Sequence, residues 1–136
     1  MNILVTGGTG FVGKALVEAL LSRGDSITVL TRSIEKAQAI FPEKTLQFLA
    51  ALSTLKDLNG FDAVINLAGE PIFDKKWTAQ QKEKLRHSRI DLTQQLVQLI
   101  NQSEYPPVLI SGSATGIYGD GGEDLITEET NPSSQF

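Results

Sequence analysis

The chain has 136 residues, 40% of them hydrophobic and none of them cysteine, which suits one domain without disulfides, thiolate catalysis or zinc–thiolate sites. Its formal net charge of −4 comes without a basic cluster, which argues against nucleic acid or an anionic membrane as a partner. The single histidine, His87, excludes a histidine-based metal site, and the lack of a basic leader or a long apolar run predicts a cytoplasmic protein.

The first elements in chain order are an apolar strand at residues 2–6 and a helix from about Phe11 to Arg23. A glycine-rich turn with the spacing G-x-x-G-x-x-G joins them. Glycines let backbone N–H groups approach a pyrophosphate, and the N-terminus of the following helix adds a favourable dipole. We therefore expect the turn to bind a dinucleotide through Thr6, Gly7, Gly8, Thr9, Gly10, Phe11, Val12 and Gly13.

Two other interpretations of this turn are weaker. One is a tight strand-to-helix turn that holds no ligand. The other is the start of a triphosphate-binding loop, because Gly8 to Lys14 fits the pattern G-x-x-x-x-G-K. Ala15 then stands where that loop requires serine or threonine, so the chain lacks a magnesium ligand that triphosphate chemistry needs.

The rest of the chain alternates between strands and helices. Apolar and β-branched runs predict strands at residues 27–31, 46–49, 63–68 and 108–111. Helices are predicted at residues 33–40 and 78–101, with a short helix or turn at 52–58 and a loop from Gly112 onward. This alternation predicts an α/β fold, a Rossmann-like doubly wound parallel sheet of strand order 3-2-1-4-5, forming one domain over residues 1–136.

The residues after the second strand bear on the choice of cofactor. An Asp or Glu there would hydrogen-bond the ribose of NAD, but this chain has Thr31, Arg32 and Ser33. A guanidinium beside a hydroxyl suits the 2′-phosphate of NADP, so we expect NADP to be preferred, with NAD as the alternative. An exposed arginine at the start of a helix, with no ligand, is the plainer interpretation.

Three motifs follow one another along the chain: the glycine turn at 6–13, the segment Asn66 to Gly69, and the segment Ser111 to Gly119. Together they resemble the extended short-chain dehydrogenase/reductases, and more closely the NAD-dependent epimerase/dehydratase family. Within that family, residues 66–72 and 76–78 resemble an atypical subgroup of sugar-nucleotide epimerase-like proteins. The resemblance covers essentially the whole chain.

The resemblance implies a role for each motif. The glycine turn would hold the pyrophosphate, and the adenosine and nicotinamide ribose side of the cofactor would be lined by Asn66, Leu67, Ala68 and Gly69. Ser111 and Gly112 would also bind the cofactor. Ser113 would hydrogen-bond a substrate carbonyl or hydroxyl near the nicotinamide, with help from Thr115. Hydride transfer creates or consumes an alkoxide, so a hydroxyl donor at that point lowers the barrier.

The chain departs from the family in its proton donor. The Tyr-x-x-x-Lys pair of the family is missing, since Tyr105 is followed four positions later by Leu109, and Tyr118 by Gly122. We therefore expect an N-terminal portion of a longer protein, incomplete at the C-terminal end of the sheet and inactive alone. An uncovered sheet edge would also favour a homo-oligomer.

The full-length protein would be an NAD(P)-dependent epimerase, dehydratase or reductase. Its substrate would be a nucleotide sugar or a related carbonyl or hydroxyl compound. The alternative is a non-catalytic dinucleotide-binding sensor or regulatory module.

Overall fold

The computed structural model describes residues 1–42, 45–69, 76 and 78–133. The strands in chain order are β1 (Asn2–Thr6), β2 (Ser26–Leu30), β3 (Gln47–Leu49), β4 (Ala63–Asn66) and β5 (Val108–Ser111). The helices are α1 (Phe11–Ser22), α2 (Ile34–Ile40) and α3 (Ala79–Gln102), with short 3-10 helices η1 (Leu52–Thr54) and η2 (Thr115–Tyr118).

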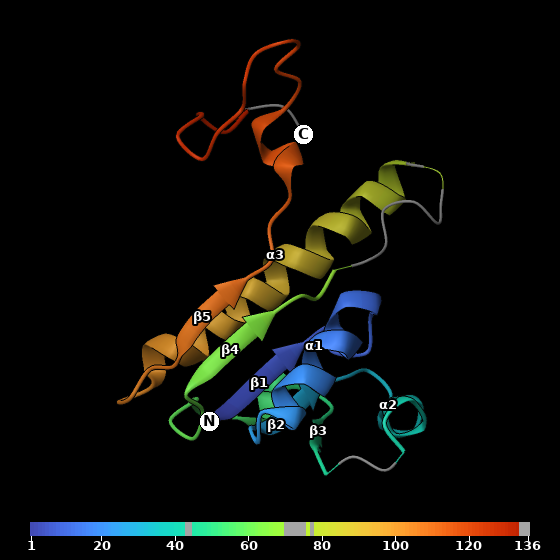
Figure 1. Ribbon diagram of the computed structural model, residues 1–136, viewed down its shortest axis with the longest axis vertical. Coiled ribbons are helices and arrows are strands. Elements are labelled where there is room, and N and C mark those ends of the chain that lie inside the picture. The colour runs from blue at the N-terminus through green and yellow to red at the C-terminus, as the bar shows by residue number, and fades with distance from the viewer. Residues whose placement is uncertain (43–44, 70–75, 77, 134–136) are drawn as a thin grey trace.

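The strands form one parallel sheet of order β3-β2-β1-β4-β5, which confirms the predicted fold class and topology. β1 lies at its centre, with Leu4 opposite Thr28 of β2 and Val64 of β4. Helices α1 and α3 cover opposite faces of the sheet (Figure 1). All five carboxyl ends therefore meet at one edge, and the turn into α1 lies at that edge.

Alternate residues of β1, β2, β3 and β4 contribute to two apolar cores. Ile3 and Val5 of β1 pack in the core beneath α1, which includes Val17, whereas Leu4 packs in the core beneath α3, which includes Leu96. Strands that are buried on both faces read as continuous apolar runs, as β1 and β4 do here. This burial on both faces holds β1 and β4 in place between the two cores.

Strand β5 is an edge strand of the described sheet and is less covered than the others. Val108 and Ile110 are exposed, while Leu109 between them packs in the α3 core. Beyond β5, the chain leaves the sheet and extends past its carboxyl edge (Figure 1). The loop predicted from Gly112 onward contains η2, a short turn closed by the bond from the Ile117 N–H to the Ala114 carbonyl at 3.1 Å.

The amino edge of the sheet holds a buried carboxylate. Asp25 precedes β2, and its side chain is 6% exposed. Its oxygens accept hydrogen bonds from the N-terminal amino group of Met1 at 3.0 Å and from Nε of Arg23 at 2.6 Å. The hydrogen bond from Arg23, followed by that from the amino group, lowers the pKa of Asp25 below its ordinary value of 3.8. The ion pairs thus tie the start of β1 to the start of β2.

Asp25 is expected to make stability depend on acid pH. A carboxyl whose pKa is lower in the folded state adds stability above its unfolded pKa, and this is lost as the pH falls through the lowered folded value. In urea unfolding between pH 7 and pH 3, Asp25→Asn should therefore be less stable at pH 7 and lose less stability on acidification than the wild type. The exposed Asp124→Asn serves as the control. Parallel pH profiles of wild type and Asp25→Asn would contradict this role.

Candidate functional site

The glycine turn is closed by contacts of its own backbone. The Gly10 N–H donates to the Gly7 carbonyl at 3.0 Å, and Gly7 has a φ of +70°, a conformation that L side chains rarely adopt. A Cβ on Gly7 would lie 2.6 Å from the carbonyl carbon of Leu67, just after β4. A Cβ on Gly13 would collide with the Gly7 carbonyl oxygen. The turn is therefore packed against β4 on one side and against the first turn of α1 on the other.

The start of α1 faces the carboxyl edge without a capping side chain. Gly10 occupies the N-cap, and the described first turn carries no acidic residue. Such a helix end presents backbone N–H groups and a positive dipole end to an anion. Phe11 is 98% exposed and Val12 is also exposed, so both side chains face solvent at the predicted cofactor segment.

A buried hydrogen-bond network joins three strand ends to α3. The Thr6 hydroxyl donates to Oδ1 of Asn66 at 2.6 Å and accepts from the Ala68 N–H at 3.3 Å. Nδ2 of Asn66 donates to the hydroxyls of Thr93 and Ser111, each at 3.2 Å. Asn66 is 6% exposed and Thr6 is fully buried. This network sets the positions of the β1, β4 and β5 ends relative to one another.

Thr93 is a member of this network that the sequence did not predict. It lies in the predicted helix between Arg89 and Leu96, on the stripe of residues that packs toward the sheet. The feature of the sequence that could have identified it is a threonine within the apolar stripe of this helix. Its partner Asn66 was predicted as a cofactor residue, and the structure places its side chain in the network.

The backbone after β4 continues this edge. The Leu67 N–H donates to the Thr6 carbonyl at 3.1 Å, and the Gly112 N–H donates to the Asn66 carbonyl at 2.8 Å. The first bond places the residues after β4 beside the end of β1, where the glycine turn begins, and the second places Gly112 beside the end of β4. Gly69 lies against the guanidinium of Arg89 from α3.

The residues after β2 form a tight turn into α2. The Thr31 hydroxyl donates to the Ser33 carbonyl at 3.2 Å and accepts from the Ser33 N–H at 3.3 Å. The Ser33 hydroxyl accepts from the Lys36 N–H at 3.4 Å and caps α2. Both hydroxyls therefore shape the turn, while Arg32 between them is exposed.

The two predicted catalytic residues lie beyond the network. Ser113 is exposed in the segment that leaves the sheet after β5 (Figure 1). Thr115 begins η2, and its side chain lies outside the described part of the structure. Residues 70–72 and Trp77, which contribute to the family resemblance, also lie outside it. The roles of Ser113 and Thr115 stay predictions.

His87 lies on the exposed side of α3. Its Nδ1 is 2.9 Å from Asp91 and its Nε2 is 2.9 Å from Glu83, each four positions away. The hydrogen bond to Asp91, then that to Glu83, raises the pKa of His87 above 6.5. His87 follows the buried Leu85 by two residues, which corresponds to a rotation of about 200° around the helix axis. His87 therefore points away from the sheet. The imidazole is therefore not part of the carboxyl-edge site.

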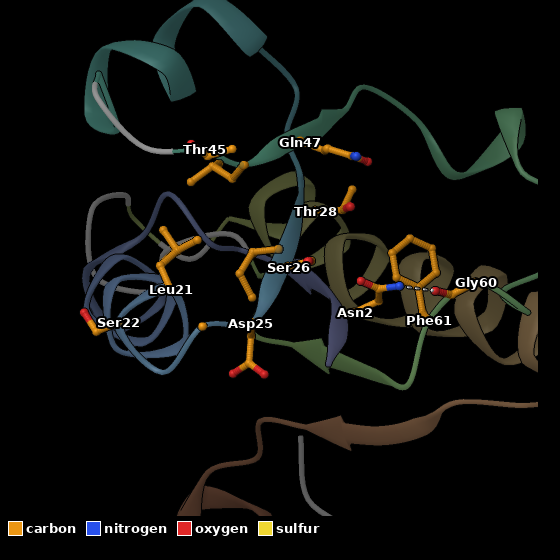
Figure 2. Close-up of a pocket in the computed structure, with 13 residues that line it drawn as sticks. Asn2, Leu21, Ser22, Asp25, Ser26, Thr28, Thr45, Gln47, Gly60 and Phe61 are labelled. Atoms are coloured by element: carbon orange, nitrogen blue, oxygen red, sulfur yellow. Dashed lines mark hydrogen bonds between the residues drawn. The ribbon is translucent and has the colours of Figure 1, made fainter.

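A hollow of about 730 Å³ opens at the opposite, amino edge of the sheet. Figure 2 shows its lining from three strand starts and the turn before β4, including Asn2, Ser26, Thr28, Gln47, Gly60 and Phe61. Asp25, its charged lining residue, is already engaged by Met1 and Arg23. The polar network and the glycine turn lie at the other end of the strands, so we place the functional site there.

Two further observations concern metal ions and membranes. Among the residues that the structure describes, no group of three His, Cys, Asp or Glu side chains is placed to hold a metal ion. Within the same residues, none of the helices combines the length and the apolar character needed to cross a membrane.

Comparison with known proteins agrees with the family resemblance of the sequence motifs. The family model described as "NAD dependent epimerase/dehydratase family" matches residues 3–136. The chain is 41% identical to the "Epimerase family protein SDR39U1 homolog, chloroplastic" of Arabidopsis thaliana, over 99% of this chain and 40% of that protein. It is 36% identical to the "Epimerase family protein YfhF" of Bacillus subtilis, over 99% of this chain and 45% of the relative. The chain thus spans less than half the length of these relatives.

Among solved structures, human epimerase family protein SDR39U1 (isoform 2) with NADPH matches with a TM-score of 0.70 and 30% identity. That match covers 87% of this chain and 38% of the human chain. The glycine turn and the strand order agree with these matches. The chain belongs to the NAD dependent epimerase/dehydratase family.

Proposed function

We propose that this chain is the cofactor-binding domain of an epimerase/dehydratase-type oxidoreductase. It would bind NADP(H) at the carboxyl edge of its sheet. The observation that carries this proposal is the glycine turn packed against the end of β4, at the point where the chain order of the strands reverses. Dinucleotides bind at such switch points in doubly wound sheets. Family membership favours an enzyme over a non-catalytic sensor.

The residues present fit a dinucleotide. Where Gly7 and Gly13 stand, added side chains would meet backbone atoms, so the turn keeps its backbone bare beside the uncapped start of α1. The turn at residues 6–13 would hold the pyrophosphate, and residues 66–69 and 111–112 would border the nicotinamide half. The nicotinamide supplies hydride transfer when bound. Ser113, assisted by Thr115, would donate a hydrogen bond to the substrate oxygen as its charge develops.

The proposed NADP preference rests on Arg32. Its side chain is exposed after β2, between two residues whose hydroxyls hold the turn in shape. A planar guanidinium matches the geometry of a phosphate. The solved human relative, 30% identical to this chain, is with NADPH, which supports the same choice.

The substrate proposal is a nucleotide sugar or a related carbonyl or hydroxyl compound. A solved structure of MoeE5 in complex with UDP-glucuronic acid and NAD is 25% identical to this chain, with a TM-score of 0.74. That match covers 98% of this chain and 43% of MoeE5, so more than half of MoeE5 has no counterpart in the match. The likeness supports the substrate class through the cofactor half alone.

Arg32→Ala tests the cofactor assignment. Loss of a charge-assisted hydrogen bond to phosphate should weaken NADPH binding about tenfold or more. NADH affinity should change less than about twofold, because NADH lacks the 2′-phosphate. Calorimetric titration of the wild type, Arg32→Ala and the exposed control Arg86→Ala with both cofactors measures this. An unchanged NADPH affinity in Arg32→Ala would remove Arg32 from the site.

A further inference from the structure

Arg89 brings a positive charge from α3 to the end of β4. A Cβ placed on Gly69 would lie 2.9 Å from Cζ, 2.9 Å from Nη2 and 3.2 Å from Nε of Arg89. Three atoms of one plane at nearly equal distance from a point mean that the flat face of the guanidinium covers Gly69. The missing side chain of Gly69 therefore leaves room for this cation.

The guanidinium is also held from its own helix. Nη1 donates to the Leu85 carbonyl at 3.3 Å and to the Ser88 hydroxyl at 3.4 Å. Arg89 lies one helical turn before Thr93, whose hydroxyl accepts from Asn66 in the buried network. The position of the charge is thus tied to the strand ends and to the helix together.

The place of Arg89 along the edge determines which part of a dinucleotide it meets. The sheet order puts β2 on one side of β1 and β4 on the other. In the dinucleotide-binding arrangement the adenosine ribose lies at the β2 end and the pyrophosphate at the turn after β1. The remaining half, which carries the nicotinamide, then extends toward β4, where Arg89 covers Gly69.

The two redox forms of the nicotinamide differ in charge. The oxidised ring carries one positive charge and the reduced ring is neutral. We propose that Arg89 is a specificity-determining residue that disfavours the oxidised cofactor and biases the site toward NADPH. The inference rests on the proposed function, because it requires a dinucleotide at this edge.

The expected effect is moderate because the site is partly solvated. Two like charges several ångströms apart at intermediate dielectric repel enough to change an equilibrium by about threefold to tenfold. In the wild type, the dissociation constant of NADP⁺ should exceed that of NADPH. In Arg89→Gln, the ratio of the two constants should fall about threefold to tenfold, mainly through tighter binding of NADP⁺.

Calorimetric titration with NADP⁺ and NADPH measures this ratio directly. Arg89→Lys keeps the charge and should retain most of the bias. Arg86→Gln, an exposed arginine on the same helix, should leave the ratio unchanged. Gly69→Ala keeps the charge but displaces the guanidinium, a flexible side-chain end, and should reduce the bias while the protein stays folded by circular dichroism.

The outcomes separate this inference from the proposed function. If Arg89→Gln changes both dissociation constants by the same factor, Arg89 acts through structure or general anion attraction and the inference is wrong. If the wild type binds NADPH yet shows no preference over NADP⁺, the inference is again wrong, while the proposed function stands. If the wild type binds neither form, the proposed function falls and the inference with it.

Discussion

Replacing Gly13 by alanine is expected to destabilise the protein strongly. The new Cβ would collide with the Gly7 carbonyl oxygen and lie 2.7 Å from the Gly8 Cα, and neither backbone atom can rotate away. Alanine would by itself favour a helix over glycine by about 1 kcal/mol. The forced separation of the turn from α1 outweighs this gain, and we expect a net loss of about 2–4 kcal/mol.

Gly60→Ala is the matched control, because a Cβ at Gly60 meets no atom within 4 Å. Its free energy of unfolding should stay within about 0.5 kcal/mol of the wild type. Urea unfolding followed by circular dichroism compares the three proteins. Where Gly13→Ala still folds, its NADPH affinity should also drop, because the turn that shapes the site has moved. Equal urea midpoints for the two variants would show that the turn is looser than its contacts indicate.

Asn66→Ala is expected to have the second largest effect. The substitution removes the side chain that connects Thr6, Thr93 and Ser111 in the buried network. The fully buried Thr6 hydroxyl then loses its acceptor, which lies at 2.6 Å. The substitution also removes the donor to Thr93 and Ser111. Orphaned buried polar groups cost about 1–3 kcal/mol each, so we expect a loss of about 2–4 kcal/mol.

A double-mutant cycle with Thr93→Val tests whether the network acts as a unit. Once Asn66 is alanine, the Thr93 hydroxyl has lost that donor, so Thr93→Val should cost less than it does in the wild type. Asn101→Ala, an exposed asparagine on the same helix as Thr93, is the control and should be nearly neutral. Strict additivity of the two losses would mean that Asn66 and Thr93 stabilise the fold separately.

The sheet order and the glycine turn follow from local patterns in the sequence. Apolar runs that alternate with helical segments fix the number of strands, and right-handed crossovers then fix their order. The glycine spacing likewise lies within one short segment. Each of these features depends on residues close together in the chain, which is why the prediction and the structure agree on them.

The polar network depends on residues far apart in the chain and was only partly predicted. Thr6 and Asn66 are 60 positions apart, and Asn66 and Thr93 are 27 apart. The strand predicted at residues 63–68 ends at Asn66 in the structure. Leu67 and Ala68 follow it and donate their N–H groups to the carbonyl and the hydroxyl of Thr6. The pairing of Gly69 with Arg89 is of this kind too. Sequence spacing alone does not specify which side chain fills the space above a glycine.

The central position of β1 has a consequence for synthesis on the ribosome. β1 is made before the other strands of the described sheet, yet one of its two neighbours is β4, which pairs Ile3 with Ala63. The core beneath α1 also includes Ala63 and Ile65. The nascent chain must therefore hold one side of β1 unpaired while some sixty residues emerge, a non-local pairing that slows folding and exposes apolar backbone. A chaperone that binds extended apolar segments would meet β1 in that interval.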